Sequence, residues 1–125
     1  GEAFRLNRYD KGKSGENNAC KYLEDKGYTV VARNYRSKKG EIDIVAREGG
    51  CLVFVEVKSW GIVPFSETGF SIGRVKKSRM IRTVKQYLYE NQKAVSELDI
   101  RFDLIFLNPL KGTLTHSENV IGEFH

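Results

Sequence analysis

The sequence has few cysteines and no long apolar run, and these two scarcities argue against whole classes of protein. Cys20 and Cys51 lie far apart and belong to no Cys-x-x-Cys or Cys/His ligand pattern, which disfavours a zinc site and a disulfide scaffold. No apolar stretch approaches the ~20 residues of a membrane-spanning helix, and no signal peptide is recognisable. We therefore expect a cytoplasmic protein with reduced thiols and no membrane segment.

Internal repeats and low-complexity tracts are also absent. The length of 125 residues suits one compact domain, because domains commonly hold about 100 to 150 residues. The polar, basic, glycine-containing start predicts a flexible arm over residues 1–13. A single domain is then expected over residues 14–125.

The expected secondary structure predicts a layered α/β fold. Ser14 can cap the start of a first helix, and Gly27 stands where a glycine would end it. A second helix is expected over residues 73–91, and strands over 28–35, 41–47, 51–58, 101–107 and, more weakly, 113–120. A three-strand meander followed by a helix and one or two strands needs a crossover back into the sheet. We therefore expect an α/β sandwich with a mixed sheet.

The dipeptide Gly49-Gly50 predicts a tight hairpin between the second and third strands. If these glycines form the turn, the numbers of paired residues add up to 99, which places Asp43 opposite Glu56. The same rule places Glu41 opposite Lys58. Period-two alternation puts these four side chains on one face of the sheet. The other face is apolar and should pack against a helix; it carries Ile42, Ile44, Ala46, Val53, Val55 and Val57.

Two carboxylates that face each other across a ladder repel unless a cation lies between them. Mg²⁺ prefers oxygen ligands and takes one or two carboxylates, so Asp43, Glu56 and the Val57 carbonyl form a suitable partial shell. Lys58 would orient or deprotonate the attacking water, or stabilise negative charge on a phosphate. Glu16, which begins the buried stripe of the first helix, would complete the shell directly or through water.

Each of these residues also has an ordinary structural interpretation. Glu56 and Lys58 could be exposed strand residues, and Asp43 could form a diagonal ion pair with Lys58 worth at most ~1 kcal/mol. Glu16 could stabilise the helix N-terminus through the macrodipole. A shared site accounts better for all four, because both elements direct an acid toward their packed side.

Lysine and arginine total 21 against 16 acidic residues, a net charge of +5. This balance favours a polyanionic partner such as nucleic acid, although basic surfaces also occur on proteins that bind none. The candidate nucleic-acid-binding residues are Lys38, Lys39, Trp60, Arg74, Lys77, Arg82 and Lys85. A cationic helix face is more often simply solvated, and Trp60 could cover a core edge instead of stacking on a base. His116 and His125 have no recognisable partners and receive no role.

Several motifs together resemble a known family. They are Gly15-Glu16, Ala19, Leu23, Gly27-Tyr28, Arg33-Asn34, Gly40-Glu41-Ile42-Asp43 and Phe54-Val55-Glu56-Val57-Lys58, followed by Arg101-Phe102-Asp103 and Glu118-Asn119. In these motifs the chain resembles the YraN-type family of bacterial endonucleases. That family is similar to the restriction-endonuclease-like, PD-(D/E)XK superfamily, including archaeal Holliday-junction resolvases. The resemblance covers nearly the whole chain.

The resemblance implies a restriction-endonuclease-like α/β/α sandwich with a metal site. By position, Asp43 would be the hairpin aspartate, Glu56 and Lys58 the E-x-K pair, and Glu16 the helix acid. Ile42 replaces the superfamily's proline, and Ser59-Trp60 stands where threonine and arginine are expected.

We therefore expect a Mg²⁺- or Mn²⁺-dependent endonuclease that hydrolyses phosphodiester bonds, in DNA rather than RNA and in branched or structured forms. The alternative is a nucleic-acid-binding module on the same fold that cuts nothing, or cuts only with a partner. A homodimer would suit the cutting of two strands.

Overall fold

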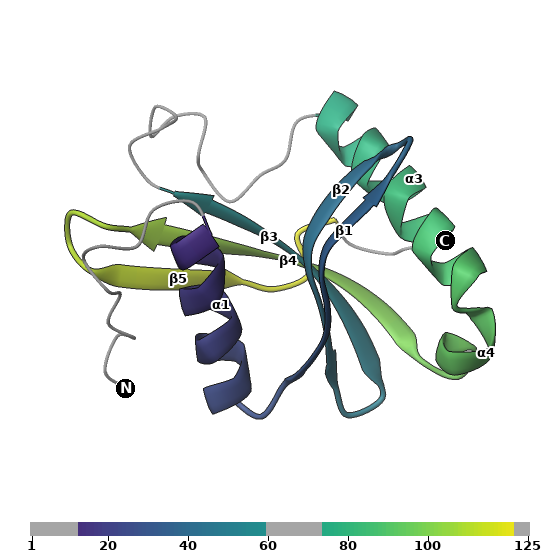
Figure 1. Cartoon of the computed structure of the whole chain (residues 1–125), viewed down its shortest axis with the longest axis horizontal. Helices are drawn as coiled ribbons and strands as arrows, with labels where there is room; N and C mark the ends of the chain where they lie inside the picture. The colour runs from purple at the N-terminus through teal and green to yellow at the C-terminus, as the bar shows by residue number, and fades with distance from the viewer. Residues whose placement is uncertain (1–12, 60–73, 122–125) are drawn as a thin grey trace.

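A five-stranded mixed sheet forms the centre of the computed structural model, which describes residues 13–59 and 74–121 (Figure 1). The helices are α1 (Lys13–Asp25), α3 (Arg74–Glu90) and α4 (Gln92–Val95). The strands are β1 (Thr29–Ser37), β2 (Gly40–Glu48), β3 (Cys51–Ser59), β4 (Asp99–Asn108) and β5 (Thr113–Ser117). They lie in chain order, and β3 pairs with β4 in parallel whereas the other neighbours are antiparallel. This confirms the expected crossover and mixed sheet.

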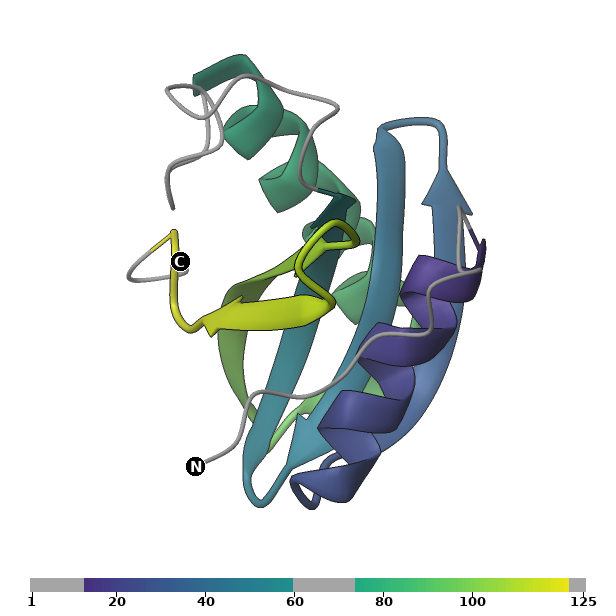
Figure 2. The same ribbon diagram turned by 90° about the vertical axis from the view of Figure 1, so that its left-hand side faces the viewer.

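Helices α1 and α3 cover opposite faces of the sheet (Figure 2). On one face α1 packs in a cluster of Ala19, Cys20, Leu23, Tyr28, Ile44, Ala46, Val53, Val55, Ile105 and Leu107. On the other, α3 packs in a cluster of Ile42, Val45, Leu52, Phe54, Met80, Val84, Tyr87, Phe102 and Ile121. The α/β sandwich predicted from the sequence is confirmed, and its layers are consistent with a restriction-endonuclease-like fold. Within the described ranges, no helix is both long enough and apolar enough to cross a membrane.

The end of α1 has the backbone geometry predicted for Gly27, which adopts a φ of 95°. The N–H of Tyr28 donates to the carbonyl of Leu23 at 2.9 Å, and the N–H of Gly27 donates to the carbonyl of Glu24 at 3.0 Å. These two bonds form a Schellman motif, and Tyr28 packs in the same cluster as Leu23. Helix α1 starts at Lys13; the rest of the predicted basic arm lies outside the described residues.

The hairpin between β2 and β3 has the predicted register, but its pairing stops sooner than predicted on the side away from the turn. Its five pairs run from Glu48 with Cys51 to Ile44 with Val55, and all add up to 99. Beyond Ile44, β2 continues along β1 only, while β3 continues along β4 as far as Ser59. The two strands diverge there, as Figure 1 shows. The predicted cross-strand pairs, Asp43 with Glu56 and Glu41 with Lys58, are therefore wrong as ladder pairs.

A distortion in β1 accompanies this separation. Asn34 adopts a positive φ of 52°, and it lies between the two β1 residues that pair with Ile44 and Ile42. Ile44 packs in the α1 cluster, whereas Ile42 packs in the α3 cluster. The prediction that Ile42 and Ile44 share one face is wrong, because the left-handed backbone of Asn34 interrupts the two-residue alternation.

Gly40 brings the tip of the β1–β2 hairpin directly onto α3. A Cβ atom at this position would lie 2.8 Å from Thr83 Oγ1, and the φ of Gly40 is +156°. The Thr83 hydroxyl is held in place because it donates to the carbonyl of Arg79 at 2.8 Å. The turn itself is shorter than the gap between the expected strands 28–35 and 41–47, since only Lys38 and Lys39 separate the paired residues Ser37 and Gly40.

Candidate active site at the separation of β2 and β3

Asp43 lies where the two strands part. Its Oδ2 accepts a hydrogen bond of 2.8 Å from the backbone N–H of Val57, so a side chain takes the place of the missing ladder partner. In a strand, the N–H and C=O of one residue point to the same edge. The carbonyl of Val57 therefore also faces the space that β2 has left.

The carboxylate of Asp43 is unusually easy to protonate. Burial, with smaller contributions from the nearby carboxylates of Glu56, Glu16 and Glu41, raises its pKa to about 6, against the opposing hydrogen bond from Val57. Among the described residues, no cation forms an ion pair with Asp43. Glu16 comes from the α1 side of the sheet and Glu56 from the α3 side. The separation of the strands thus exposes one carboxylate to negative charges from both layers.

Glu56 and Lys58 lie at the α3 side of the same place. Glu56 forms an ion pair with Lys76 of α3, and its side chain is 17% exposed. Burial lowers the pKa of Lys58, the neighbouring ammonium of Lys76 lowers it further, and the charge of Glu56 opposes both. Two amines and one carboxylate therefore share a partly buried space.

Glu16 is held by β1. It is 8% exposed, and its Oε1 accepts hydrogen bonds from Arg33 Nε at 3.0 Å and from Asn34 Nδ2 at 2.9 Å. The left-handed backbone of Asn34 therefore lies beside the buried acid of α1. Glu16 is close enough to Asp43 to raise its pKa, and its own charge is compensated by Arg33.

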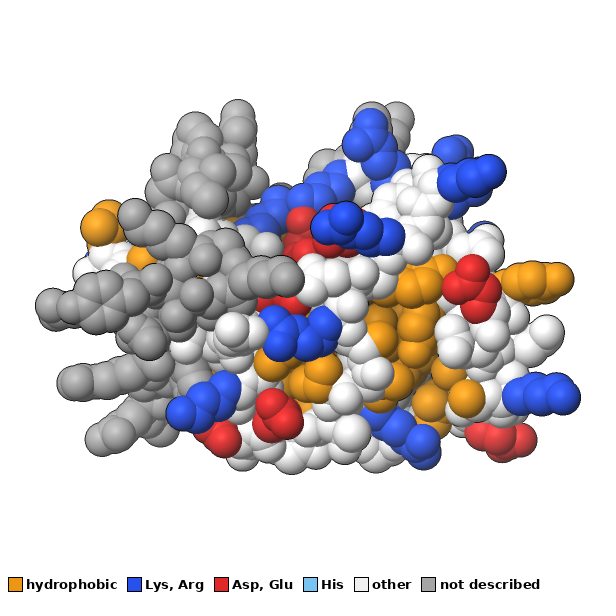
Figure 3. All heavy atoms as spheres, in the orientation of Figure 1, with side chains coloured by type: hydrophobic (Ala, Val, Ile, Leu, Met, Phe, Trp, Pro, Cys, Tyr) orange, Lys and Arg blue, Asp and Glu red, His pale blue; other side chains and the backbone are white. Residues whose placement is uncertain are grey.

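A hollow of about 450 Å³ opens beside these residues. It is lined by Gly40, Glu41, Glu56, Lys76, Arg79, Met80 and Thr83. In Figure 3, acidic side chains gather between the strand ends and α3, and lysine and arginine side chains surround them. The lining of the hollow thus combines two acidic residues, Glu41 and Glu56, with two basic residues, Lys76 and Arg79.

The donor set suits an oxygen-seeking divalent cation. Magnesium commonly keeps several waters and takes one or two carboxylates, so Asp43, Glu56 and the Val57 carbonyl supply enough protein oxygens. The pKa of Asp43 is raised mainly by burial and to a smaller extent by the carboxylates of Glu56 and Glu16. A cation at this place would stabilise the charged form of Asp43 against both effects.

The predicted nucleic-acid-binding residues fall into three positions. Lys38 and Lys39 are exposed in the β1–β2 turn. Lys77, Arg82 and Lys85 line a separate hollow on α3, together with Ser78 and Ile81. Trp60 and the side chain of Arg74 lie outside the described residues.

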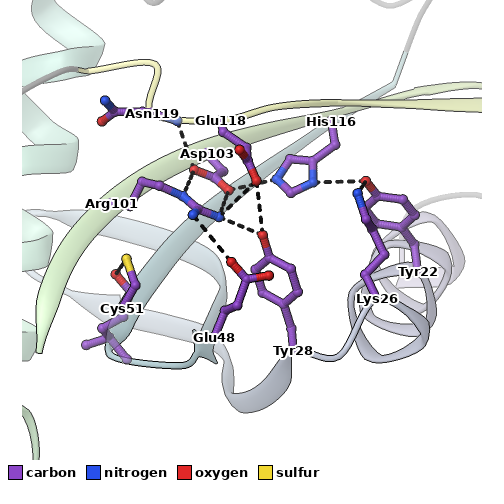
Figure 4. Close-up of polar contacts among 11 residues, drawn as sticks. Tyr22, Lys26, Tyr28, Glu48, Cys51, Arg101, Asp103, His116, Glu118 and Asn119 are labelled. Carbon is purple, nitrogen blue, oxygen red and sulfur yellow. Dashed lines mark hydrogen bonds and ion pairs between the residues drawn. The ribbon is translucent and has the colours of Figure 1, made fainter.

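A second polar cluster lies on the α1 face of β4 and β5 (Figure 4). Asp103 is fully buried and accepts hydrogen bonds from Arg101 at 2.9 and 2.8 Å and from the backbone N–H of Asn119 at 3.0 Å. His116 Nε2 lies 2.7 Å from Asp103 Oδ2, and its Nδ1 lies 3.0 Å from the hydroxyl of Tyr22. The cluster thereby fastens α1 to the β4–β5 edge of the sheet.

Asp103, His116 and Glu118 could hold a metal ion. In the described part of the chain they are the one group of three His, Cys, Asp or Glu residues whose ligand atoms all lie within 4.8 Å of one another. Arg101, however, lies 2.8 Å from Asp103 and 3.4 Å from Glu118, so a guanidinium already compensates part of the charge of these two carboxylates. The carboxylates of this group therefore depend less on a metal ion for charge compensation than the carboxylate of Asp43 does.

The sequence analysis missed several residues of these clusters, and only one of them had a signal in the sequence. Lys76 stands four residues before Met80, on the packed stripe of α3, so its spacing could have shown that it points toward the sheet. Nothing in the sequence pairs His116 with Asp103 or Arg33 with Glu16, because these contacts depend on how α1 crosses the sheet.

Comparison with known proteins finds one family. The model of the family described as "Uncharacterised protein family UPF0102" matches residues 15–107, a segment that contains Glu16, Asp43, Glu56 and Lys58 but not His116. A UPF0102 protein of Sulfurihydrogenibium sp. (strain YO3AOP1) is 40% identical over 118 residues, which cover 94% of this chain and 98% of that protein. One from Lachnoclostridium phytofermentans is 44% identical over 105 residues, with coverages of 82% and 86%. A solved structure, Pyrococcus furiosus SfsA in complex with Ca²⁺, aligns with a TM-score of only 0.41 at 14% identity, over 85% of this chain and 63% of that one.

Proposed function

We propose that this chain, which belongs to the uncharacterised protein family UPF0102, is a Mg²⁺- or Mn²⁺-dependent endonuclease that hydrolyses phosphodiester bonds in DNA. The observation that carries the proposal is the parting of β2 and β3. It leaves Asp43 in a partly buried place beside Glu56, with a pKa raised to about 6 by burial and by neighbouring carboxylates. The resemblance of the same motifs to YraN-type endonucleases supports the same chemistry.

Asp43, Glu56 and the carbonyl of Val57 would hold the metal ion. A divalent ion bound there would make its water a stronger acid and polarise the phosphate. Glu16 stays with Arg33 and Asn34 and acts through a bridging water. Lys58, whose pKa burial and Lys76 lower, orients the attacking water or stabilises the negative charge that grows on the phosphate.

Binding of DNA is assigned to the basic side chains around the hollow. Lys38 and Lys39 are exposed in the turn that precedes Gly40, a residue of the hollow, and Lys77, Arg82 and Lys85 extend the positive charge along α3. Such contacts give affinity that does not depend on base sequence, which suits recognition of DNA by shape, as at a branch. The free thiols of Cys20 and Cys51 support the cytoplasmic location that we propose with this substrate.

A DNA-binding module without turnover is the second candidate. The ion pairs Lys76–Glu56 and Arg33–Glu16 favour it, because they compensate two of the acids without a metal ion. Both candidates use the same DNA-binding surface. They differ in whether the acidic residues bind a metal ion and catalyse hydrolysis.

Incubation with linear, nicked, flapped and four-way-junction DNA, with EDTA, Mg²⁺ or Mn²⁺, separates them. We expect the wild-type protein to cut at least one of these DNAs with Mg²⁺ or Mn²⁺ and to cut none of them with EDTA. Glu56→Gln and Lys58→Met should abolish the cutting while circular dichroism shows that both variants are folded.

Exposed residues on α1 give matched controls for these variants. Glu24→Gln and Lys21→Met make the same chemical changes away from the hollow and should cut like the wild type. Cutting that survives in Glu56→Gln and Lys58→Met would point to a contaminating nuclease and remove the proposed site. Salt-sensitive DNA binding with no cutting under any condition would favour the module.

A further inference from the structure

Lys76 is the one basic residue of α3 shown in contact with the E-x-K pair in the described structure. Its ammonium forms an ion pair with Glu56 and lies close enough to Lys58 to lower the pKa of that amine, together with the larger effect of burial. The side chain of Lys76 is 43% exposed, while that of Glu56 is 17% exposed. Lys76 therefore reaches inward from an accessible position.

The position of this ammonium conflicts with that of a metal ion on the same carboxylate. Lys76 and Glu56 both line the hollow between the hairpin tip and α3. An ammonium and a divalent cation on one carboxylate group repel each other strongly when both are partly shielded from water. One of the two cations must then weaken the binding of the other.

We propose that Lys76 is a displaceable counter-ion of Glu56, which a divalent cation releases, and that the freed ammonium then binds a phosphate of the substrate in the same hollow. The inference rests on the proposed function for the existence of the metal site, and it adds a regulation of that site. In the metal-free protein the ion pair with Glu56 occupies the ammonium of Lys76. Metal binding frees this ammonium for a phosphate.

The surroundings of Lys76 suit this exchange. Arg79 lies one turn further along α3 and lines the same hollow, so a released ammonium would share a phosphate with a second cation. A lysine also suits the role chemically. Its ammonium is a point charge on a flexible stem and can change partners at low cost, whereas the planar guanidinium of arginine favours a fixed two-point contact.

The test compares metal-free wild type, Lys76→Met and Lys77→Met by calorimetric titration with Mn²⁺. Methionine keeps most of the length of the side chain and removes its charge. Lys77 is the matched control, since it neighbours Lys76 on the same helix but lines the other hollow. We expect Lys76→Met to bind Mn²⁺ about fivefold more tightly than the wild type, the scale set by a partly exposed ion pair. Lys77→Met should bind Mn²⁺ like the wild type.

Anisotropy of a labelled four-way junction, with EDTA or with Ca²⁺, tests the second half of the proposal. With EDTA, Lys76→Met should bind the junction nearly as well as the wild type, because Glu56 already occupies Lys76. With Ca²⁺ the variant should bind several-fold more weakly than the wild type. The loss caused by Lys77→Met should be equal in both conditions.

Each contrary outcome identifies what fails. Wild-type Mn²⁺ binding with equal or weaker binding by Lys76→Met overturns the counter-ion role and leaves the metal site standing. Failure of all three proteins to bind Mn²⁺ overturns the metal site and, with it, this inference. Tighter Mn²⁺ binding without the Ca²⁺-dependent loss of junction affinity overturns the phosphate role alone.

Discussion

The side chain of Asp43 and the backbone of Val57 are joined by a hydrogen bond of 2.8 Å at the point where β2 and β3 part. The bond satisfies a backbone N–H that has lost its ladder partner, which would otherwise be costly away from water. It also fixes the carboxylate beside the Val57 carbonyl. One contact therefore ends the hairpin and orients the oxygens of the candidate site.

Asp43→Asn should stabilise the metal-free protein while removing its metal binding. The folded-state pKa of Asp43, about 6, lies above the unfolded value near 3.8, so its contribution is favourable at low pH and is lost as pH rises through 6. Asparagine stays neutral and can still accept from Val57. At about pH 8 with EDTA, urea unfolding should give a gain of ~1–3 kcal/mol.

The same comparison at about pH 4 should show little difference, because the wild-type carboxyl is then largely protonated. A variant less stable than wild type at about pH 8 would contradict the claim that the charge of Asp43 is unfavourable in the folded protein.

Gly40→Ala should destabilise the protein and disturb the hollow. Its Cβ would lie 2.8 Å from Thr83 Oγ1, a short side chain held by Arg79, and its φ of +156° is strained for alanine. We expect a loss of ~2 kcal/mol or more in urea unfolding. Gly50→Ala is the control, because a Cβ there meets no atom within 4 Å. Equal stability of the two variants would show that the hairpin tip does not rest on α3.

Asp103→Asn should cost ~3 kcal/mol of unfolding free energy, since it removes one partner of a buried ion pair and leaves Arg101 poorly compensated. Burial alone would raise the pKa of Asp103, but hydrogen bonds from His116, Arg101 and the Asn119 backbone outweigh it and hold the pKa below its ordinary value. The stabilisation is therefore present above about pH 3.8 and is lost as pH falls further.

Guanidinium-induced unfolding between about pH 7 and pH 3 measures this dependence. Arg36→Gln breaks an ion pair with Glu41 whose side chains are 77% and 42% exposed, and should change stability by less than ~0.5 kcal/mol. A loss in Asp103→Asn no larger than in Arg36→Gln would show that the buried cluster does not fasten α1 to the sheet.

Local rules in the sequence predicted the elements and the hairpin register. Gly27 ends α1 because a left-handed residue lets two backbone N–H groups reach the helix carbonyls, and this depends only on neighbouring residues. The Gly49-Gly50 turn likewise sets the five pairs that follow it. Such features need no knowledge of distant contacts.

The same rules failed where distant elements decide the geometry. The register predicted from the turn extended to a pair between Asp43 and Glu56. In the structure, β2 instead follows β1 toward α3, where Gly40 lies against Thr83. Whether Glu56 meets a lysine from α3 depends on where that helix crosses the sheet. The sequence could place the acids near one another, and only the packing of α3 shows that Lys76 lies against one of them.

The basic face of α3 should determine the salt dependence of DNA binding. Each lysine or arginine that neutralises a phosphate of duplex DNA releases counter-ions and adds about 0.9 to the slope of log affinity against log salt. A triple variant, Lys77→Gln, Arg82→Gln and Lys85→Gln, should therefore lower that slope by about 2 to 3 in anisotropy titrations. The control triple replaces Lys21, Lys93 and Lys111 with glutamine; these lysines are exposed on α1, α4 and the β4–β5 turn. Both triples remove the same net charge, so equal slopes would mean that overall charge, rather than the α3 face, attracts the DNA.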